Sequence, residues 1–483
     1  MGGDNASEIE RQARVNLDLH DALTRAFPST LEGRLLFAIA VLFASFQVAT
    51  AAHVIDLPSL LVRTFHVGFL TLLAFPLVAV AREMSAPSRA LAWTLGLAGF
   101  AVALYQWWEN VPLLQRAGDL TSIDLAVGIV SLAVLFLAAW TVMGLPLAVL
   151  CALFLLYCLF GNYLPAPLNH RGYALDQVID HMAYGTEGIY GIPTYVSSTY
   201  IFLFILFGAF LERVGMIRLF TDVSMGLVGS SRGGPAKVAV VSSGLMGTIS
   251  GSGVANVVTT GQFTIPLMKR FGYSAAFAGG VEATASMGGQ IMPPVMGAVA
   301  FIMAETLGVP YSEIVKAALI PAILYFVSAF WMVHLEAGRR GLVGLPASEL
   351  PSAARALRDG WHLLVPLVVL VTFLFSGYTP LYAGTVGLVM TVLLMLGLSV
   401  ALDLPNAVLR TIYWIGLGLV AASAIEVGLW LAGLVIAALV AWSLKSRGGR
   451  AVLADVVSGL ADGARTALPV GIACAIGGIV IGT

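Results

Sequence analysis

A polar, glycine-rich stretch, "GTISGSGVANVVTTG" (residues 247–261), interrupts a long apolar region of the chain. Among its side chains with neutral oxygen atoms are those of Ser250, Ser252, Asn256 and Thr259. Neutral oxygens and backbone carbonyl dipoles can replace the hydration shell of an alkali cation without any carboxylate. The stretch therefore predicts a cation site. The alternative explanation is that its small residues only let helices pack closely.

A second interrupted segment follows at once, "AAFAGGVEATASMGGQIMPPVMGAVAFIMAE" (Ala275–Glu305). Its centre holds Gly288, Gly289 and Gln290, and then the pair Pro293–Pro294. Proline removes an amide donor and clashes with the preceding helical turn. The segment therefore predicts two half-helices separated by a short gap. Paired discontinuities of this kind indicate the binding site of a secondary transporter, where freed carbonyls bind the coupling ion.

The composition shows which elements must position these residues. The chain has 483 residues, of which 59% are hydrophobic and 11% are charged, and its mean hydropathy is +0.92. Soluble domains carry about twice that charged fraction. The apolar runs are Leu35–Ala51, Leu57–Ala81, Leu91–Trp107, Ile123–Met143, Leu145–Phe160, Tyr195–Leu211, Ile314–Val333, Trp361–Phe375, Leu381–Leu398 and Ile412–Leu444, the last long enough for two spans. These runs predict an all-α polytopic membrane protein.

Irregular backbone survives inside a membrane only when it is surrounded by protein or lines water. Within Val238–Met268 we therefore predict two short helices that meet at a polar tip, forming a re-entrant hairpin. Lys237 precedes this segment, and Lys269 and Arg270 follow it. Because basic residues favour the cytoplasmic side, they place both ends of the hairpin on one side of the membrane.

Several other functions are excluded by the sequence. The net charge of −1 supplies no basic field for nucleic acid. The cysteines Cys151, Cys158 and Cys474 form neither a CxxC motif nor a disulfide framework. The chain contains no HExxH zinc motif, and residues 248–251 read Thr-Ile-Ser-Gly rather than the GxSG of an intramembrane serine protease. An enzyme is therefore not expected, and neither is a cofactor other than a coupling ion.

The composition also changes along the chain. Residues 1–30 are polar and of mixed charge, and they read as a cytoplasmic tail without the features of a signal peptide. Residues 31–165 form simple apolar spans, which predict a helical membrane module. Residues 166–190 form a connecting loop. In residues 191–483 glycine, proline and polar residues enter the membrane segments, so we assign this part to a transport domain.

The stretch "SSRGGPAKVAVVSSGLMGTISGSGVANVVTTGQFTIPLMKRFGYSAAFAGGVEATASMGGQIMPPVMGAVAFIMAE" closely resembles the large permease subunit of tripartite ATP-independent periplasmic (TRAP) transporters. "YLPAPLNHRGYALDQVIDHM", "YIFLFILFGAFLERVGM" and "IPAILYFVSAFWMVHLEAGRRGL" are similar to the permeases that work with TAXI-type binding proteins, in which the small and large subunits are fused. The resemblance covers residues 105 to 350 and is highly specific.

The resemblance implies a bacterial inner-membrane symporter that receives a small organic anion, such as a C4–C5 carboxylate, from a TAXI-type periplasmic binding protein. A Na⁺ gradient, not ATP, would drive uptake. The hairpin would map to Gly234–Gly261 and the broken helix to Ser274–Glu305. The implied Na⁺ ligands lie on Ser250, Ser252, Asn256, Thr259, Gly288 and Gly289, and the implied substrate contacts on Thr260, Gln262, Gln290 and Glu282.

Glu282 has two open interpretations. A carboxylate within a membrane helix must face protein or water. It can serve transport directly, or it can form a hydrogen bond that ties the mobile part of the protein together.

The chain departs from the family pattern in two places. Residues 138–142 read Ala-Ala-Trp-Thr-Val where close relatives carry a charged Glu-Ala-x-Arg-Arg motif. The family also repeats its hairpin and broken helix with inverted topology in an elevator-type transporter. Here residues 191–400 form the first repeat and 405–483 the start of the second, so we expect the second repeat to be incomplete. A self-sufficient Na⁺-coupled dicarboxylate symporter and an inactive truncated remnant are the alternatives.

Overall fold

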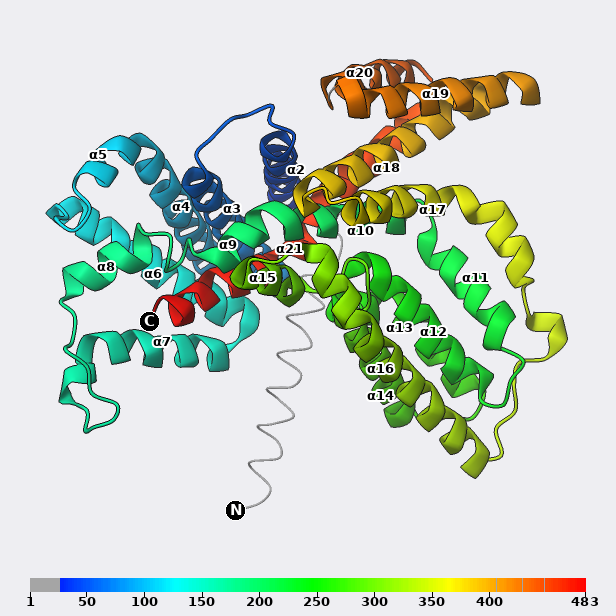
Figure 1. Cartoon of the computed structure of the whole chain (residues 1–483), viewed down its shortest axis with the longest axis horizontal. Coiled ribbons are helices and arrows are strands. Elements are labelled where there is room, and N and C mark those ends of the chain that lie inside the picture. Colours follow the sequence, from blue (N-terminus) through cyan, green and yellow to red (C-terminus); the bar gives the residue numbers. More distant parts are fainter. Residues whose placement is uncertain (1–26, 405, 428, 447) are drawn as a thin grey trace. The chain divides into compact units, whose positions relative to one another are not determined.

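The computed structural model describes residues 27–404, 406–427, 429–446 and 448–483 (Figure 1). Within these ranges every regular element is a helix. Ten of the helices are long and apolar enough to cross a membrane: α2 (Leu31–Ala51), α3 (Ser59–Ala81), α4 (Ala86–Trp108), α6 (Ser122–Met143), α7 (Leu145–Phe160), the continuous α9, η2 and α10 (Ile192–Val196, Ser197–Ile201, Phe202–Arg213), α16 (Tyr311–Arg339), α17 (Ala353–Phe375), α18 (Pro380–Asp403) and α21 (Gly449–Gly482). The predicted all-α polytopic membrane fold is confirmed.

The long apolar run at 412–444 forms two helices, as its length predicts. These are α19 (Ala407–Val427) and α20 (Leu429–Lys445), which lie against each other and against α18. The predicted cytoplasmic tail, residues 1–30, falls almost entirely outside the described residues.

The chain divides into two compact units, each with its own packing. The first contains the described residues up to Phe202 together with Ala464–Thr483. Helix α3 lies at the centre of this unit and contacts α2, α4 and α6. Of its most apolar stretch of residues 83% is buried, compared with 28% of the corresponding stretches in α2 and α4. The outer helices therefore keep apolar surface available for lipid. The predicted boundaries at residues 165 and 190 stay predictions.

Small residues bring the end of α21 against the rest of the first unit. A methyl group on Gly471 would lie 2.5 Å from Leu70 Cδ1, and one on Gly478 would lie 2.2 Å from the Gly188 carbonyl oxygen. The close packing of α21 thus depends on the absence of side chains at these two positions, as in other membrane helix contacts.

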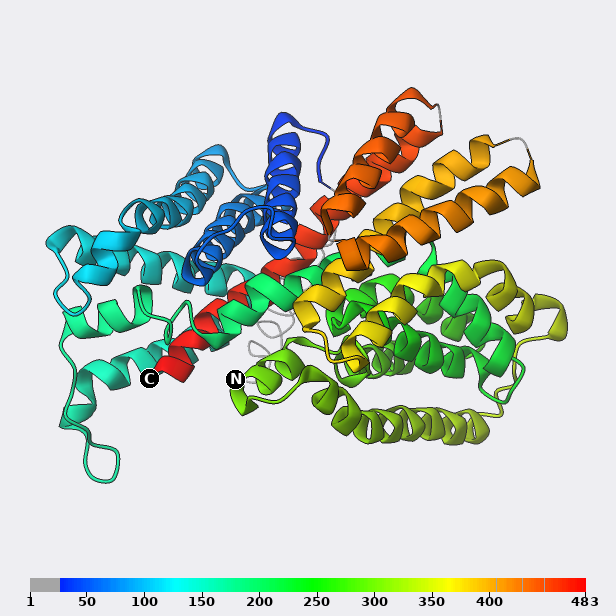
Figure 2. The same ribbon diagram turned by 45° about the horizontal axis from the view of Figure 1, so that its top comes forward.

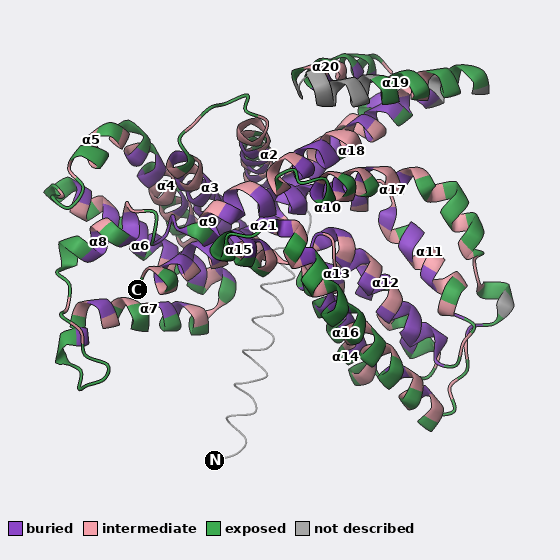
Figure 3. Ribbon diagram, in the orientation of Figure 1, coloured by how far each residue is buried: buried purple, intermediate pink, exposed green. Residues whose placement is uncertain are grey.

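The second unit, Leu203–Gly463, contains both interrupted segments. Helices α12 (Gly234–Ser250), α13 (Gly253–Arg270) and α14 (Ala275–Gly288) pack against one another, and α16 packs on α12 and α14 (Figures 1 and 2). Helix α11 (Met216–Val228) contacts α12 and α17. Figure 3 shows the result: α12 is largely buried, whereas α16 is mostly exposed. The first half of the hairpin therefore lies inside this unit, whereas α13 and α14 each keep an exposed face.

Candidate functional site

The glycine-rich stretch forms the turn between α12 and α13. Helix α12 ends at Ser250 and α13 begins at Gly253, as the sequence predicts for two helices meeting at a polar tip. Gly251 has a φ of +59°, and a Cβ there would lie 2.1 Å from the Met296 carbonyl oxygen. Both the backbone conformation and the available space therefore require glycine. That the two ends of this hairpin lie on one side of the membrane stays a prediction.

The second segment is a broken helix. Helix α14 ends at Gly288, a single 3₁₀ turn η3 (Gly289–Ile291) follows, and α15 (Ala298–Leu307) begins after the two prolines. The Tyr311 hydroxyl from α16 holds the gap, since it lies 3.0 Å from the Pro294 carbonyl oxygen and 2.5 Å from that of Val295. The Gly297 amide donates to the Gln290 carbonyl oxygen at 2.7 Å. The break is thus a bonded structure with defined ends.

The tip and the break contact each other through glycines. A methyl group on Gly247 would lie 2.4 Å from the Gly289 Cα, and one on Gly289 would lie 3.4 Å from Asn256 Nδ2. This approach places the Asn256 amide beside the 3₁₀ turn that follows α14. Three of the predicted ion-binding positions, Asn256, Gly288 and Gly289, therefore lie in one neighbourhood.

Asn256 is fully buried, and its amide has a defined orientation. Its Nδ2 donates to the Ser243 carbonyl oxygen at 2.8 Å, so Oδ1 is the free end of the amide. The Thr260 hydroxyl lies 3.4 Å from this Oδ1 but 2.5 Å from Glu282 Oε1 and 2.8 Å from the Asn256 carbonyl oxygen. Since a hydroxyl has one proton, Asn256 Oδ1 receives at most a long, weak hydrogen bond.

Ser250 provides a second buried side-chain oxygen, at the end of α12. Its side chain is 7% exposed, and within the described residues its Oγ has no hydrogen-bond partner. A buried polar atom left in this state costs about 1–3 kcal/mol. Ser250 Oγ in the last turn of α12 and Asn256 Oδ1 in the first turns of α13 are neutral oxygens of the kind that a small cation takes as ligands.

The other predicted ion-binding side chains make local helical bonds. Ser252 Oγ accepts from the Ala255 amide at 3.3 Å and caps α13. The Thr259 hydroxyl donates to carbonyl oxygens of its own helix, at 3.0 Å to Ala255. Both hydroxyl oxygens retain a lone pair with which they can bind a cation. Their roles as Na⁺ ligands stay predictions.

The four predicted substrate contacts fall into two groups. Gln262 and Gln290 are exposed, and Gln290 Nε2 lies beside the hairpin tip, 3.1 Å from where a Cβ on Gly253 would stand. Thr260 and Glu282 are 1% and 0% exposed and bond to each other. Their contact with substrate is untested, and in this conformation both are closed to solvent.

Glu282 lies at the centre of a hydroxyl cluster that sequence reasoning missed. Its Oε1 accepts from Ser243 and Ser286 at 2.9 Å each and from Thr260, and its Oε2 accepts from Thr264. The members are Ser243, Thr260, Thr264, Ser286 and Glu282. The sequence does contain a pattern that indicates this cluster. Thr260 and Thr264 are four residues apart, as are Glu282 and Ser286, and this spacing places each pair on one face of its helix.

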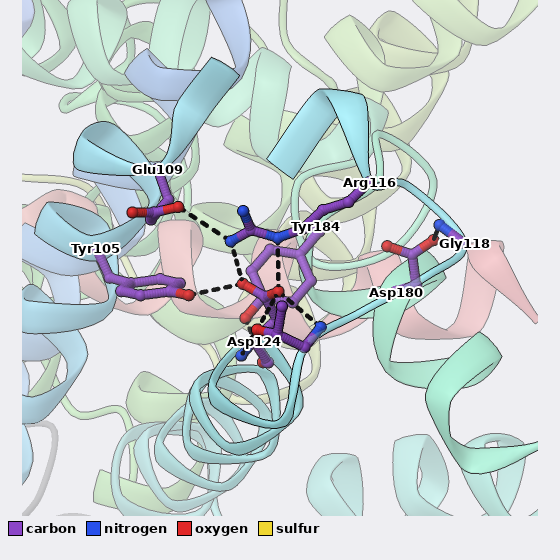
Figure 4. A network of polar contacts seen from close by, with 8 residues as sticks. Tyr105, Glu109, Arg116, Gly118, Asp124, Asp180 and Tyr184 are labelled. Carbon is purple, nitrogen blue, oxygen red and sulfur yellow. Dashed lines mark hydrogen bonds and ion pairs between the residues drawn. The ribbon is translucent and has the colours of Figure 1, made fainter. Parts of the chain in front are cut away.

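The first unit contains a second buried polar cluster (Figure 4). Asp124, at the start of α6, is fully buried and receives two bonds of 2.8 Å from the Arg116 guanidinium. The Tyr105 hydroxyl donates to the same carboxylate at 2.6 Å, and Arg116 also contacts Glu109 at 3.0 Å. Hydrogen bonds to these two carboxylates raise the pKa of Arg116. The cluster fixes the connection between α4 and α6.

A cavity of about 660 Å³ lies next to this cluster. Its wall includes Tyr184 and Asp180, which also join the network: the Tyr184 hydroxyl donates to the Asp124 carbonyl oxygen at 2.5 Å, and Asp180 accepts from the Gly118 amide at 2.9 Å. Arg171, Gln177 and His181 add further polar groups to a wall that also includes leucines of α3 and of the α4–α6 connection. Burial raises the pKa of Tyr184, so its hydroxyl stays protonated as a donor.

The sequence is similar to those of known membrane permeases, in agreement with the all-helical membrane fold. The family model described as "Tripartite ATP-independent periplasmic transporter, DctM component" matches residues 129–483. The chain is 30% identical over 190 residues to the C4-dicarboxylate TRAP transporter large permease protein DctM of Pseudomonas aeruginosa. It is 25% identical over 184 residues to the 2,3-diketo-L-gulonate TRAP transporter large permease protein YiaN of Escherichia coli. It is 26% identical over 184 residues to the sialic acid TRAP transporter large permease protein SiaM of Vibrio cholerae.

Each of these alignments covers 38% of this chain, and the chain spans 43% of the length of each relative.

Proposed function

Because the chain belongs to the DctM-component family of tripartite ATP-independent periplasmic transporters, we propose that it is the permease of a secondary transporter that imports a small organic anion. Its family and its ten apolar helices make it a multi-pass protein of the bacterial inner membrane, with a role in transport rather than catalysis. The proposal also names a substrate, a partner protein and a coupling ion.

The proposed substrate is a carboxylate. The relatives are named for C4-dicarboxylate, sialic acid and 2,3-diketo-L-gulonate, all of which carry a carboxylate group. A periplasmic binding protein would deliver the anion, and the resemblance of residues 105–350 favours the TAXI type. The family match begins at residue 129, after α2, α3 and α4. These preceding helices support the proposal that a small-subunit-like module is fused to the permease.

The proposed coupling ion is Na⁺. The observation that carries this proposal is the pair of buried oxygens, Asn256 Oδ1 and Ser250 Oγ, at the contact between the hairpin and the broken helix. Neutral oxygens beside unpaired carbonyls are the ligands that alkali cations take in membrane proteins. A cation bound by Ser250 Oγ would remove the free-energy cost of leaving that oxygen unpaired, and Asn256 Oδ1, which receives only one long hydrogen bond, keeps a lone pair for a cation.

Uptake by the purified protein tests the proposal. The purified protein would be reconstituted in liposomes, and labelled C4–C5 carboxylates would be added outside. The arms would differ in the cognate binding protein, in an inward Na⁺ gradient and in an inward proton gradient. We expect uptake only when the binding protein and Na⁺ are both present. Uptake without the binding protein would instead support a self-sufficient symporter, and uptake driven by protons alone would refute Na⁺ coupling.

A further inference from the structure

Glu282 is fully buried one hydroxyl group away from the predicted ion site. Thr260 Oγ1 lies 2.5 Å from Glu282 Oε1 and 3.4 Å from Asn256 Oδ1, so the two oxygens are at most about 6 Å apart. A second connection runs through Ser243, whose hydroxyl donates to Glu282 and whose carbonyl oxygen accepts from Asn256 Nδ2. The carboxylate and the amide ligand therefore belong to one bonded group.

We propose that Glu282 is the counter-charge of the ion site. Its carboxylate would compensate the positive charge of a monovalent cation bound by the neutral oxygens of Asn256, Ser250 and the adjoining carbonyls. The inference rests on the proposed function, because it assigns a role within the proposed cation site. It differs from direct ligation, since the hydroxyl of Thr260 stands between the carboxylate and Asn256 Oδ1.

The surroundings of Glu282 supply hydrogen bonds but no positive charge. All four groups bonded to its carboxylate are hydroxyls. Among the described residues, no arginine, lysine or histidine forms an ion pair with it. An ionised carboxylate is very unfavourable in such a place without a compensating charge, and a cation bound nearby would supply one. Each charge therefore lowers the cost of burying the other.

Most basic residues on the neighbouring helices contact other groups, and Lys269 at the end of α13 is exposed. Lys237 on α12 donates to Ser231 Oγ at 3.1 Å and lies over the Phe330 ring. Arg270 at the end of α13 pairs with Glu349. On α16, Lys316 pairs with Glu313, and Arg339 and Arg340 pair with Glu336. His334 lies 3.2 Å from Arg232. A cation bound at Asn256 would supply a positive charge near Glu282, which these basic side chains do not.

Glu282→Gln is the decisive variant. Glutamine keeps the side-chain length and an oxygen that accepts from Ser243 and Ser286, but it removes the charge. Binding of Na⁺ alone would be measured on the purified protein by calorimetry and by the Na⁺-dependent rise of Tm. We expect the Kd for Na⁺ to increase about tenfold or more, while Tm without Na⁺ stays unchanged or increases. Glu313→Gln, an exposed carboxylate on α16, is the matched control.

The alternative role, a hydrogen-bond centre without charge function, gives the opposite result. It predicts a lower Tm in the absence of Na⁺ and an unchanged Kd for Na⁺ in Glu282→Gln, which would overturn the inference. If the wild-type protein binds no Na⁺ at all, the proposed coupling ion is wrong, and the two failures are distinct. If the glutamine variant does not fold, Glu282→Asp keeps the charge, and a folded aspartate variant that loses Na⁺ binding would also overturn the inference.

Discussion

Gly247 and Gly289 face each other so closely that a single methyl group on Gly247 would lie 2.4 Å from the Gly289 Cα. Neither position has room for a side chain between the last turns of α12 and the end of α14. The contact explains why two interrupted segments adjacent in sequence form one site: the absence of side chains lets the hairpin tip reach the broken helix.

We expect Gly247→Ala to separate these two elements. Forcing a methyl group into close-packed backbone costs about 1–3 kcal/mol, so the variant should lower Tm and abolish Na⁺-dependent uptake. Gly280→Ala is the control, because no atom lies within 4 Å of the added methyl group and alanine favours a helix by about 1 kcal/mol over glycine. Unfolding can be followed with a thiol-reactive dye, since Cys151, Cys158 and Cys474 are buried. Unaltered uptake by Gly247→Ala would contradict the contact.

Ser250→Ala tests the buried oxygen directly. If Ser250 Oγ binds the cation, the variant weakens Na⁺-dependent uptake, and because the oxygen has no other partner, stability without Na⁺ is unchanged or slightly increased. Ser242→Ala is the matched control: Ser242 is also buried on α12, but its hydroxyl bonds to the Ala239 carbonyl oxygen of its own helix. Equal Na⁺ dependence in both variants and the wild type would remove Ser250 from the site.

Tyr311→Phe removes the hydroxyl that holds the gap of the broken helix. The ring stacked on Phe301 at 4.1 Å remains, so the loss of stability should be small, about 1 kcal/mol. We expect a larger effect on uptake, because the carbonyls of Pro294 and Val295 lose their donor. Tyr325→Phe is the comparison, since its hydroxyl donates to Thr284 within the regular helix α14. Similar uptake by the two variants would show that the gap does not need this donor.

Arg116→Gln tests the polar cluster of the first unit. Asp124 is fully buried, and removal of its cation leaves the carboxylate with only uncharged donors. We expect Tm to fall by several degrees, with Na⁺ binding in the second unit retained. Arg218→Gln is the control, because Arg218 is 90% exposed and its ion pair with Asp222 spans 3.7 Å. If both variants have the Tm of the wild type, the cluster does not stabilise the connection between α4 and α6.

Much of this architecture follows from local sequence signals. Long apolar runs predict the spanning helices because unpaired backbone is not tolerated in lipid. The run Ser250–Gly253 predicts the tip and the pair Pro293–Pro294 predicts the break, since glycine and proline act on the backbone itself. For the same reason the six ion-binding and four substrate-binding positions could be placed on elements, although their roles are untested.

The side-chain bonds were not predictable in the same way. The hydroxyl cluster joins Ser243, Thr264 and Ser286 to Glu282 across three helices, and the relative rotation of those helices is set by tertiary packing. Likewise Thr259 has the right chemistry for an ion ligand, yet its proton goes to its own helix. Residue type indicates what an atom is able to bind, whereas only packing decides which neighbour it meets.

The bonds around Glu282 also have a consequence for how the protein is made. The largest separation in sequence within that cluster is 43 residues, between Ser243 and Ser286, whereas the bond from His181 to Gly482 spans 301 residues. Contacts between nearby segments close short loops and therefore form early in folding. The cluster can assemble once α12, α13 and α14 have been synthesised and have left the ribosome. The hydroxyl bonds around Glu282 can thus form during membrane insertion, whereas the gap of the broken helix still has to wait for α16, which carries Tyr311.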